Sequence, residues 1–170
     1  MAGAVIGAGM RNVQAADDGP RSGDWLVGVD DDALKPIALA DVKTGAKQLI
    51  VFPYDPAAKR ARSDSRLNRI LLVKPEAAAL DAETQARAAA AGGVLGYSAI
   101  CTHQACDVNS WRPKEQTLLC FCHFSQFHPG ESGNVVAGPA PRALPSIALK
   151  VDGDKLVIAG AFSAAPGGGG

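Results

Sequence analysis

The segments C-T-H-Q-A-C (residues 101–106) and C-F-C-H-F-S (residues 120–125) decide the fold of this chain. They contain all four cysteines of the protein and two of its three histidines. Each segment places a Cys and a His close together, with a second Cys nearby. Short spacings of this kind on tight loops allow side chains from both segments to reach one ion or cluster.

The residue types limit what the two segments bind. Two thiolates and two neutral imidazoles suit zinc, or a [2Fe–2S] cluster in which two histidines replace two cysteines on one iron. A structural zinc module is therefore one interpretation, but it leaves two of the four cysteines without a role. A cluster accounts for the residues more completely.

The pattern C-T-H-x-x-C followed by C-x-C-H-x-S resembles the Rieske iron–sulfur signature. G-P-A-P at residues 138–141 is similar to the proline-rich loop that covers the cluster in that family. The resemblance implies a Rieske-type [2Fe–2S] cofactor. It also implies that Cys101 and Cys120 bind one iron, and that His103 and His123 bind the other.

The same resemblance gives roles to three further residues. It implies a disulfide between Cys106 and Cys122, and a hydrogen bond from Ser125 to a bridging sulfide. A disulfide beside a cluster implies an oxidising compartment. By the chain-entropy model, a crosslink that closes a loop of about 15 residues contributes about 3 kcal/mol.

Four positions depart from the Rieske proteins of quinol–cytochrome reductases. Most of those proteins have Gly, Pro and Gly where this chain has Ala105, Phe121 and Phe124. Phe127 stands where many high-potential members have a Tyr that hydrogen-bonds a ligand sulfur. We therefore expect a potential in the middle of the range of roughly −150 to +300 mV for this ligand set. C-H-F-S-x-F (residues 122–127) is instead similar to the small subunit of arsenite oxidase.

The resemblance implies an electron-transfer subunit with no catalytic residues of its own. Two Fe³⁺, two sulfides, two thiolates and two neutral imidazoles sum to zero charge, so one added electron leaves one negative charge. Because the reduced site carries only this one negative charge, its reduction potential is higher than that of an all-thiolate cluster. The partners would be a large molybdopterin-containing subunit and a cytochrome c-type carrier. The ring nitrogens of His103 and His123 that do not bind iron would face solvent or a partner and form the electron port.

Two other classes of Rieske protein are alternatives to an arsenite oxidase-like subunit. The Rieske subunit of a quinol–cytochrome c reductase would have a membrane anchor and an apolar residue at position 104, where this chain has Gln104. An aromatic-ring oxygenase needs two His and a carboxylate for its catalytic iron. After two histidines are assigned to the cluster, only His128 remains, and we assign it a surface role. One histidine is too few for the catalytic iron, which argues against this chain being the oxygenase subunit.

Composition and the N-terminus bear on location. Seventeen basic and 17 acidic residues balance, which favours neither nucleic acid nor a membrane surface as partner. Residues 1–16 resemble the remnant of an export signal, with an apolar start and a V-x-A cleavage site ending at Ala15. Their apolar run falls short of the roughly 20 residues that span a bilayer. We therefore expect a periplasmic protein without an anchor in this chain, exported folded by the twin-arginine route, although the motif of that route is absent.

Many short strands, turns rich in Gly and Pro, and one helix predict an all-β protein. We expect a Rieske-type antiparallel β-sandwich over residues 35–162, with a smaller cluster-binding subdomain at about residues 98–142. Residues 17–34 are predicted to be an N-terminal arm or linker that contains a short strand, and residues 163–170 a flexible tail.

Some local elements are also predicted. Residues 36–42 and 48–53 are expected to pair as a hairpin, and the Ala-rich residues 75–91 to form the helix, which starts at a Pro and ends at Gly-Gly. The basic stretch 55–69 is interpreted as a solvated loop or a docking surface for an acidic partner. Trp111 is expected in the core or in a lid.

Overall fold

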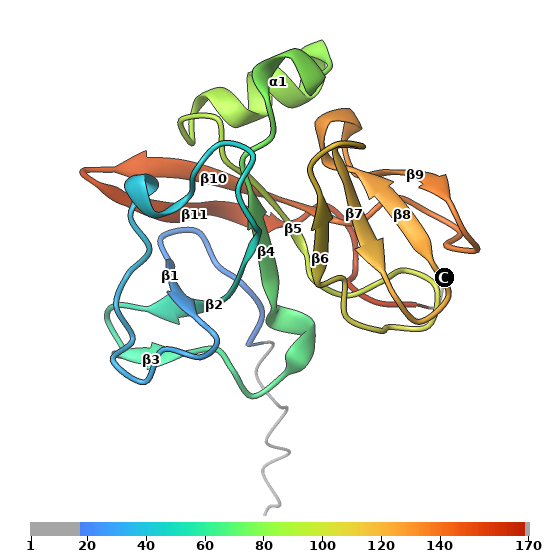
Figure 1. Ribbon diagram of the computed structural model, residues 1–170. Helices are drawn as coiled ribbons and strands as arrows, with labels where there is room; N and C mark the ends of the chain where they lie inside the picture. Colours follow the sequence, from blue (N-terminus) through green and yellow to red (C-terminus); the bar gives the residue numbers. More distant parts are fainter. Residues whose placement is uncertain (1–17, 169–170) are drawn as a thin grey trace, which may run out of the picture.

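The computed structural model describes residues 18–168, so the predicted signal remnant lies outside the described residues. The described chain forms two antiparallel sheets and one α-helix (Figure 1). In spatial order the larger sheet consists of β1 (Trp25–Gly28), β11 (Lys155–Phe162), β10 (Ser146–Asp152), β5 (Leu95–Ser98), β4 (Ile70–Val73), β2 (Leu49–Asp55) and β3 (Arg60–Ala61). Because β1 also pairs with β2, this sheet closes on itself.

The smaller sheet is formed by one continuous stretch of chain. Its strands are β6 (Ser110–Arg112), β7 (Thr117–Cys120), β8 (Ser125–His128) and β9 (Asn134–Ala137), in the order in which they occur in the sequence. All four lie within the residues 98–142 predicted as a cluster-binding subdomain. In Figure 1 this sheet stands beside the larger one, next to β4 and β5.

Strand β4 separates two hydrophobic clusters. Its four residues are all buried, and successive side chains of a strand point to opposite faces. Leu71 packs into a cluster that includes Phe127 of the smaller sheet, whereas Leu72 packs into a cluster inside the larger sheet. The first cluster also contains Trp111, which confirms a core position for this residue. One face of β4 therefore joins the two sheets.

The predicted helix is shorter than the sequence suggested. Helix α1 spans Ala82–Ala89, and a separate 3-10 turn, Ala77–Ala79, precedes it. Leu80 has extended backbone angles, and the Asp81 carboxylate accepts a hydrogen bond from the N–H of Thr84 at 2.7 Å. Asp81 is thus the N-cap, and the helix starts there instead of at residue 75.

The predicted hairpin of residues 36–42 with 48–53 is wrong. Strand β2 pairs with β1, β3 and β4, while residues 36–42 contribute only isolated bridges and the 3-10 turn Leu39–Asp41. Pro36 has no N–H to donate to a ladder, and Ile37 instead donates to the carbonyl of Leu26 at 2.8 Å. The strand that pairs with β2 comes from residues 25–28, inside the predicted N-terminal arm.

The arginines of the basic stretch bind carboxylates of this chain. Arg62 is buried and forms ion pairs with Asp18, Asp24 and Asp55. Arg66 and Arg69 both bind Asp107, at 2.6 and 3.3 Å. Arg60 binds Asp18 and Asp64 at the surface. Four of the five basic residues of the stretch are therefore paired with carboxylates of this chain, which offsets much of its positive charge.

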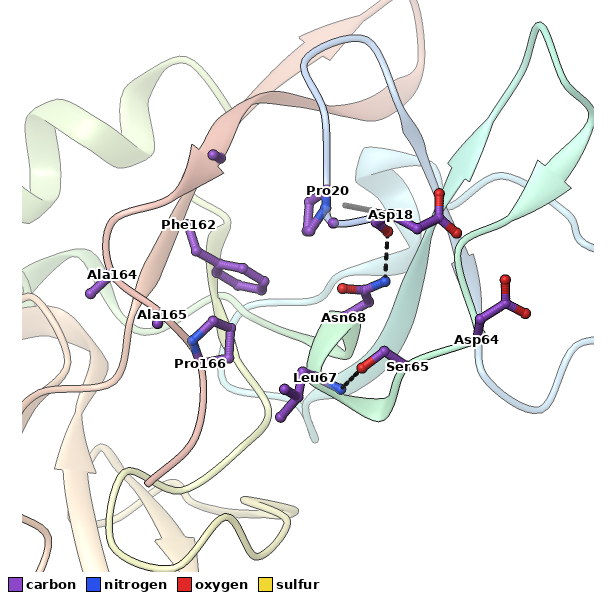
Figure 2. A pocket seen from close by; sticks show the side chains of 12 residues that line it. Asp18, Pro20, Asp64, Ser65, Leu67, Asn68, Phe162, Ala164, Ala165 and Pro166 are labelled. Carbon is purple, nitrogen blue, oxygen red and sulfur yellow. Dashed lines mark hydrogen bonds between the residues drawn. The ribbon is translucent and has the colours of Figure 1, made fainter. Parts of the chain in front are cut away.

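Residues 163–168, the described part of the segment predicted as a flexible tail, form contacts with the rest of the chain. Nη2 of Arg142 donates hydrogen bonds to the carbonyl oxygens of Ala165 and Gly167, both at 2.8 Å. The segment lines one side of a pocket of about 670 Å³ (Figure 2). Within residues 18–168, no helix is long and apolar enough to cross a membrane.

Candidate metal centre

The first segment forms a closed loop after β5. The N–H of Cys101 donates to the carbonyl of Cys106 at 2.7 Å, and the N–H of Ala105 donates to the carbonyl of Cys101 at 3.1 Å. The loop turns back because Ala105 has a left-handed backbone, with φ of +57°. The two cysteines at its ends are thereby brought side by side.

The second segment is the tip of the hairpin between β7 and β8. Cys120 and Ser125 are paired across the hairpin, so residues 121–124 form a tight loop that carries Cys122 and His123. Phe124 has a φ of +61°, again in the left-handed region. Ala105 and Phe124 occupy the two positions at which the quinol–cytochrome reductase relatives mostly have Gly. These two departures are therefore positions of backbone strain.

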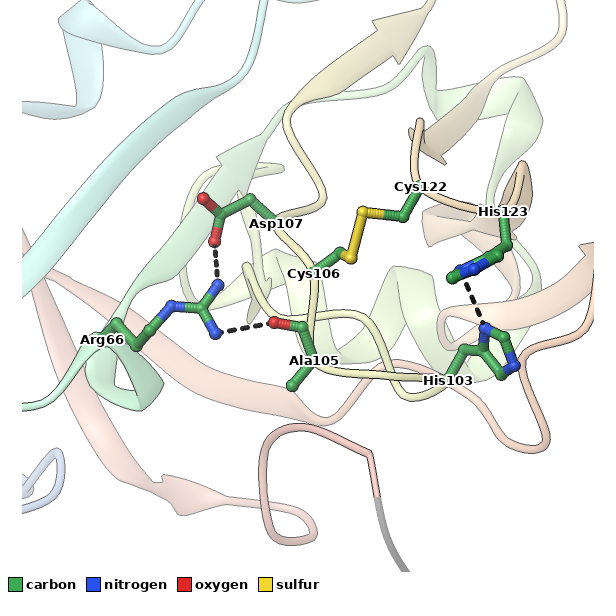
Figure 3. Close-up of a disulfide and its surroundings, with 7 residues drawn as sticks. All are labelled: Arg66, His103, Ala105, Cys106, Asp107, Cys122 and His123. Carbon is green, nitrogen blue, oxygen red and sulfur yellow. Dashed lines mark hydrogen bonds and ion pairs between the residues drawn. A yellow bond between two sulfur atoms is a disulfide. The ribbon is translucent and has the colours of Figure 1, made fainter.

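A disulfide between Cys106 and Cys122 links the two loops and confirms the predicted pairing. Figure 3 shows the two histidines on one side of this disulfide and Arg66 on the other. The sulfur of Cys120 lies within 4.8 Å of both disulfide sulfurs. Since disulfide sulfurs are not thiolates, this trio is not a separate metal site.

The remaining two cysteines are free and buried. Cys101 and Cys120 are each about 1% exposed. Burial raises the pKa of the Cys120 thiol and the neighbouring Cys101 thiol raises it further, whereas the N–H groups of Cys122 and His123 lower it. The raised pKa therefore favours the uncharged thiol of Cys120 until a cation compensates for the charge of its buried thiolate.

The two histidines lie at the protein surface. Their Nδ1 atoms are 3.2 Å apart, and their ring planes are nearly perpendicular, at 88°. His123 is exposed and His103 is partly exposed. Because the Nδ1 atoms face each other, the Nε2 atoms are left for solvent or a partner.

The donor set fits a [2Fe–2S] cluster with mixed ligands. Two free buried thiols can supply thiolates to one iron, and two facing imidazole nitrogens can bind the other. The structure brings all four predicted ligands together on two loops that the disulfide joins. The iron ligation itself stays a prediction.

Ser125 and the proline-rich loop are in contact. The hydroxyl oxygen of Ser125, which is 1% exposed, accepts a hydrogen bond from the N–H of Ala140 at 3.1 Å. Its own proton stays free to donate, as the predicted bond to a sulfide requires. A Cβ atom at Gly138 would overlap the Ser125 backbone, so this loop approaches the hairpin more closely than other residues allow.

Sequence reasoning missed one residue that holds the first loop. Nη1 of Arg66 donates to the carbonyl of Ala105 at 2.7 Å, and its Nη2 binds Asp107 (Figure 3). Thirty-nine residues separate Arg66 from Ala105, and nothing in the sequence links them.

His128 is half-buried, and its Nδ1 has no hydrogen-bond partner among the described residues.

Replacing Ala105 by glycine should raise the free energy of unfolding by about 0.5–1 kcal/mol. The left-handed backbone costs an L-residue about 1–2 kcal/mol, and the extra chain entropy of glycine offsets only part of this gain. Denaturant unfolding of the apoprotein measures the change. Ala86→Gly, at an exposed position of α1, is the matched control and should be destabilising by about 1 kcal/mol. Equal losses in both variants would contradict strain at Ala105.

Comparisons with known proteins agree with this site. Residues 68–148 match the Rieske [2Fe-2S] domain family. A Haloferax mediterranei protein, named as the Rieske subunit of a respiratory nitrate reductase, is 40% identical over 79 residues, which cover 46% of this chain and 35% of the relative. The cytochrome bc1 complex Rieske iron-sulfur subunit of Corynebacterium diphtheriae is 43% identical over 72 residues, which cover 42% of this chain and 18% of the relative. The chain thus spans about a third or less of the length of these two relatives.

Two solved structures have a fold similar to that of the chain. The ferredoxin of carbazole 1,9a-dioxygenase from Nocardioides aromaticivorans has a TM-score of 0.48 and 16% identity, covering 72% of this chain and 92% of the other. The plasma membrane Rieske protein of Synechocystis PCC 6803 has a TM-score of 0.42 and 23% identity, covering 64% and 84%.

The family match includes both Cys–His segments, the disulfide and the proline-rich loop. The two homologous proteins are both named as Rieske subunits. Residues 68–148 of this chain therefore belong to a Rieske [2Fe-2S] domain, whose cofactor is a Rieske-type [2Fe–2S] cluster.

Proposed function

We propose that this chain is an electron-transfer subunit in which Cys101 and Cys120 bind one iron and His103 and His123 bind the other. The observation that carries the proposal is the placement of two surface imidazoles beside two buried thiols, with both Nδ1 atoms turned toward each other. When bound, the cluster supplies one-electron chemistry at a potential set by mixed His and Cys ligation.

The residues of the chain have distinct tasks in this proposal. The buried thiols hold the inner iron away from water, and the disulfide keeps both loops in place. Ser125 is buried and keeps a proton that it can donate to a sulfur, which would raise the potential. The Nε2 atoms of the histidines carry protons at the surface, so proton release can accompany electron transfer.

The surroundings of His123 support a protein partner. Phe121 and Phe124 flank this residue in the sequence and are 58% and 64% exposed. Large exposed apolar side chains beside a functional group are typical of interaction sites. In this proposal the partner is a large catalytic subunit containing molybdopterin, as in the resemblance to arsenite oxidase, and the second partner is a cytochrome c-type carrier.

The proposed location is the periplasm. The Cys106–Cys122 disulfide supports an oxidising compartment, and a cluster inserted before export would require a route for folded proteins. Fractionation of the native host tests this directly. Recovery of the oxidised, cluster-containing chain in the cytoplasm would overturn the proposed location.

The test of the site is an EPR spectrum after mild reduction with ascorbate. A rhombic [2Fe–2S] signal and about two iron atoms per chain are expected. His123→Ser should abolish this signal, because it removes an imidazole ligand, whereas His128→Ala should keep it. Zinc in place of iron would refute electron transfer. A signal that requires a strong reductant would indicate a lower-potential, ferredoxin-like carrier.

A second candidate is the Rieske subunit of a quinol–cytochrome c reductase. The similarity to the Corynebacterium diphtheriae subunit favours it. Isolation of the native complex with an antibody against this chain separates the two candidates. Molybdenum in equal amount to the chain supports the catalytic-subunit partner, whereas b-type haem in its place supports the reductase.

A further inference from the structure

Arg142 joins three segments that are distant in the sequence. It follows the proline-rich loop directly, and its carbonyl oxygen accepts a hydrogen bond from the hydroxyl of Thr102 at 2.7 Å. Its guanidinium donates from one nitrogen, Nη2, to the carbonyl oxygens of Ala165 and Gly167. The residue therefore contacts the loop that carries His103 with its backbone and the C-terminal segment with its side chain.

The C-terminal segment packs on that loop through two glycines. Gly167 is buried with a φ of +91°, and a Cβ atom there would lie 3.7 Å from the Cβ of Ala105. A Cβ atom at Gly168 would overlap the carbonyl group of His103. The backbone of residues 167–168 therefore lies directly against residues 103–105, with no room for a side chain at Gly168.

Most side chains of this segment are exposed to solvent. Ala164 and Ala165 are exposed, and Pro166 is half-buried. Together with Phe162 and Leu67, these residues line an open pocket in place of a packed core (Figure 2). Hydrogen bonds from a charged donor are stronger than neutral ones, so the two bonds from Arg142 contribute strongly to holding the segment.

We propose that Arg142 is a positioning residue that holds residues 164–168 against the loop at 102–105 and thereby fixes His103. The loop is then held from two sides, by Arg66 at Ala105 and by the C-terminal segment at His103. The relevance of this clamp to the cluster rests on the proposed function, because only there is His103 an iron ligand. The clamp itself is a property of the folded chain.

Hydrogen exchange of the apoprotein, followed by mass spectrometry, tests the clamp. In Arg142→Met, which keeps the length of the side chain but removes its donors, exchange of the Ala105 amide should accelerate at least about tenfold. This amide is bonded to the carbonyl of Cys101 inside the loop. Arg142→Lys keeps a charged donor and should restore part of the protection. The peptide that covers β7 and β8 should be unchanged and serves as the internal reference.

A pair of glycine variants tests the same contact without changing any charge. Gly168→Ala should accelerate exchange in residues 102–106, because the new methyl group forces the segment and the loop apart. Gly160→Ala is the matched control, since its Cβ would lie 3.9 Å from Ala148, an ordinary contact distance. This control should leave exchange in the loop unchanged.

In the loaded protein, Arg142→Met and Gly168→Ala should both change the EPR g values and speed the loss of iron to a chelator. Unchanged loop exchange in both variants, with the C-terminal segment released, would overturn the proposal. The proposal would also be overturned if the amides of residues 164–168 stayed protected from exchange in Arg142→Met. Hydrogen exchange is measured on the apoprotein, without the cluster. Failure to find a Rieske EPR signal would therefore refute the proposed function but would not affect the exchange test of the clamp.

Discussion

Replacing Cys106 and Cys122 together by serine should lower the free energy of unfolding by about 3 kcal/mol. The disulfide joins residues 16 apart in sequence, and this crosslink restricts the unfolded chain. It is also the covalent link between the loop that carries His103 and the loop that carries His123. Denaturant unfolding of the apoprotein measures the loss, and iron content measures the effect on the site.

Two further measurements accompany the serine variant. Cys122 is exposed, so a thiol reductant should reach the bond and bring the parent protein to the stability of the variant. The same reductant should have no effect on the unfolding of the variant itself. If the double variant keeps both the stability of the parent protein and a full complement of iron, the prediction is wrong. The other contacts of the two loops would then be enough to stabilise the fold and to hold the site together.

Arg62→Met should lower the free energy of unfolding by about 3–5 kcal/mol, as expected when one partner of a buried ion pair is removed. The side chain of Arg62 is 5% exposed and that of Asp24 is 4% exposed. Nε and Nη2 of Arg62 lie 2.8 and 3.1 Å from the two oxygens of Asp24. Nη1 also binds Asp18, and Nη2 binds Asp55. Methionine fills a similar volume but leaves the carboxylate of Asp24 buried without a cation.

Arg60→Met is the matched control for this prediction. Arg60 also binds Asp18, but its side chain is 55% exposed, so its loss should cost less than about 1 kcal/mol. Chemical denaturation of both variants gives the comparison. Similar losses for Arg60 and Arg62 would mean that burial does not set the strength of this network.

Acidification tests the partly exposed edge of the same network. The N–H of Ala58 is the main cause that lowers the pKa of Asp55, and Arg62 lowers it too. The carboxylate is therefore bound more favourably in the folded state. Its contribution is present above its ordinary pKa and is lost as the pH falls through the lower folded-state value. Asp55→Asn should flatten the stability profile of the protein below about pH 4.

The chemical identity of the site is readable in the sequence because it depends on residue types at short spacing. Cys101 and His103 lie on one tight loop, and Cys120 and His123 lie on another. The pairing of Cys106 with Cys122 follows from the family pattern, and the structure confirms it.

Pairing between distant segments was decided by the tertiary structure. The strand beside β2 comes from residues 25–28, whereas residues 36–42 form only isolated bridges, and Ile37 donates to the carbonyl of Leu26 in β1. Local composition predicts a helix from residue 75, but the Asp81 cap and the contact of its N–H with the Gly130 carbonyl set the start at Ala82. The Ala content of the segment alone does not indicate the residue at which the helix begins.

The sequence by itself determined the candidate ligands of the cofactor, since cysteines and histidines at these spacings have few other uses. Only the tertiary structure decided how those groups are held. Arg66 and Arg142 bind backbone carbonyl groups of segments 39 and 23–25 residues away, and any residue type offers such a carbonyl. Contacts to backbone atoms leave no signature in the side chains that they reach, so they become visible only when the chain is folded.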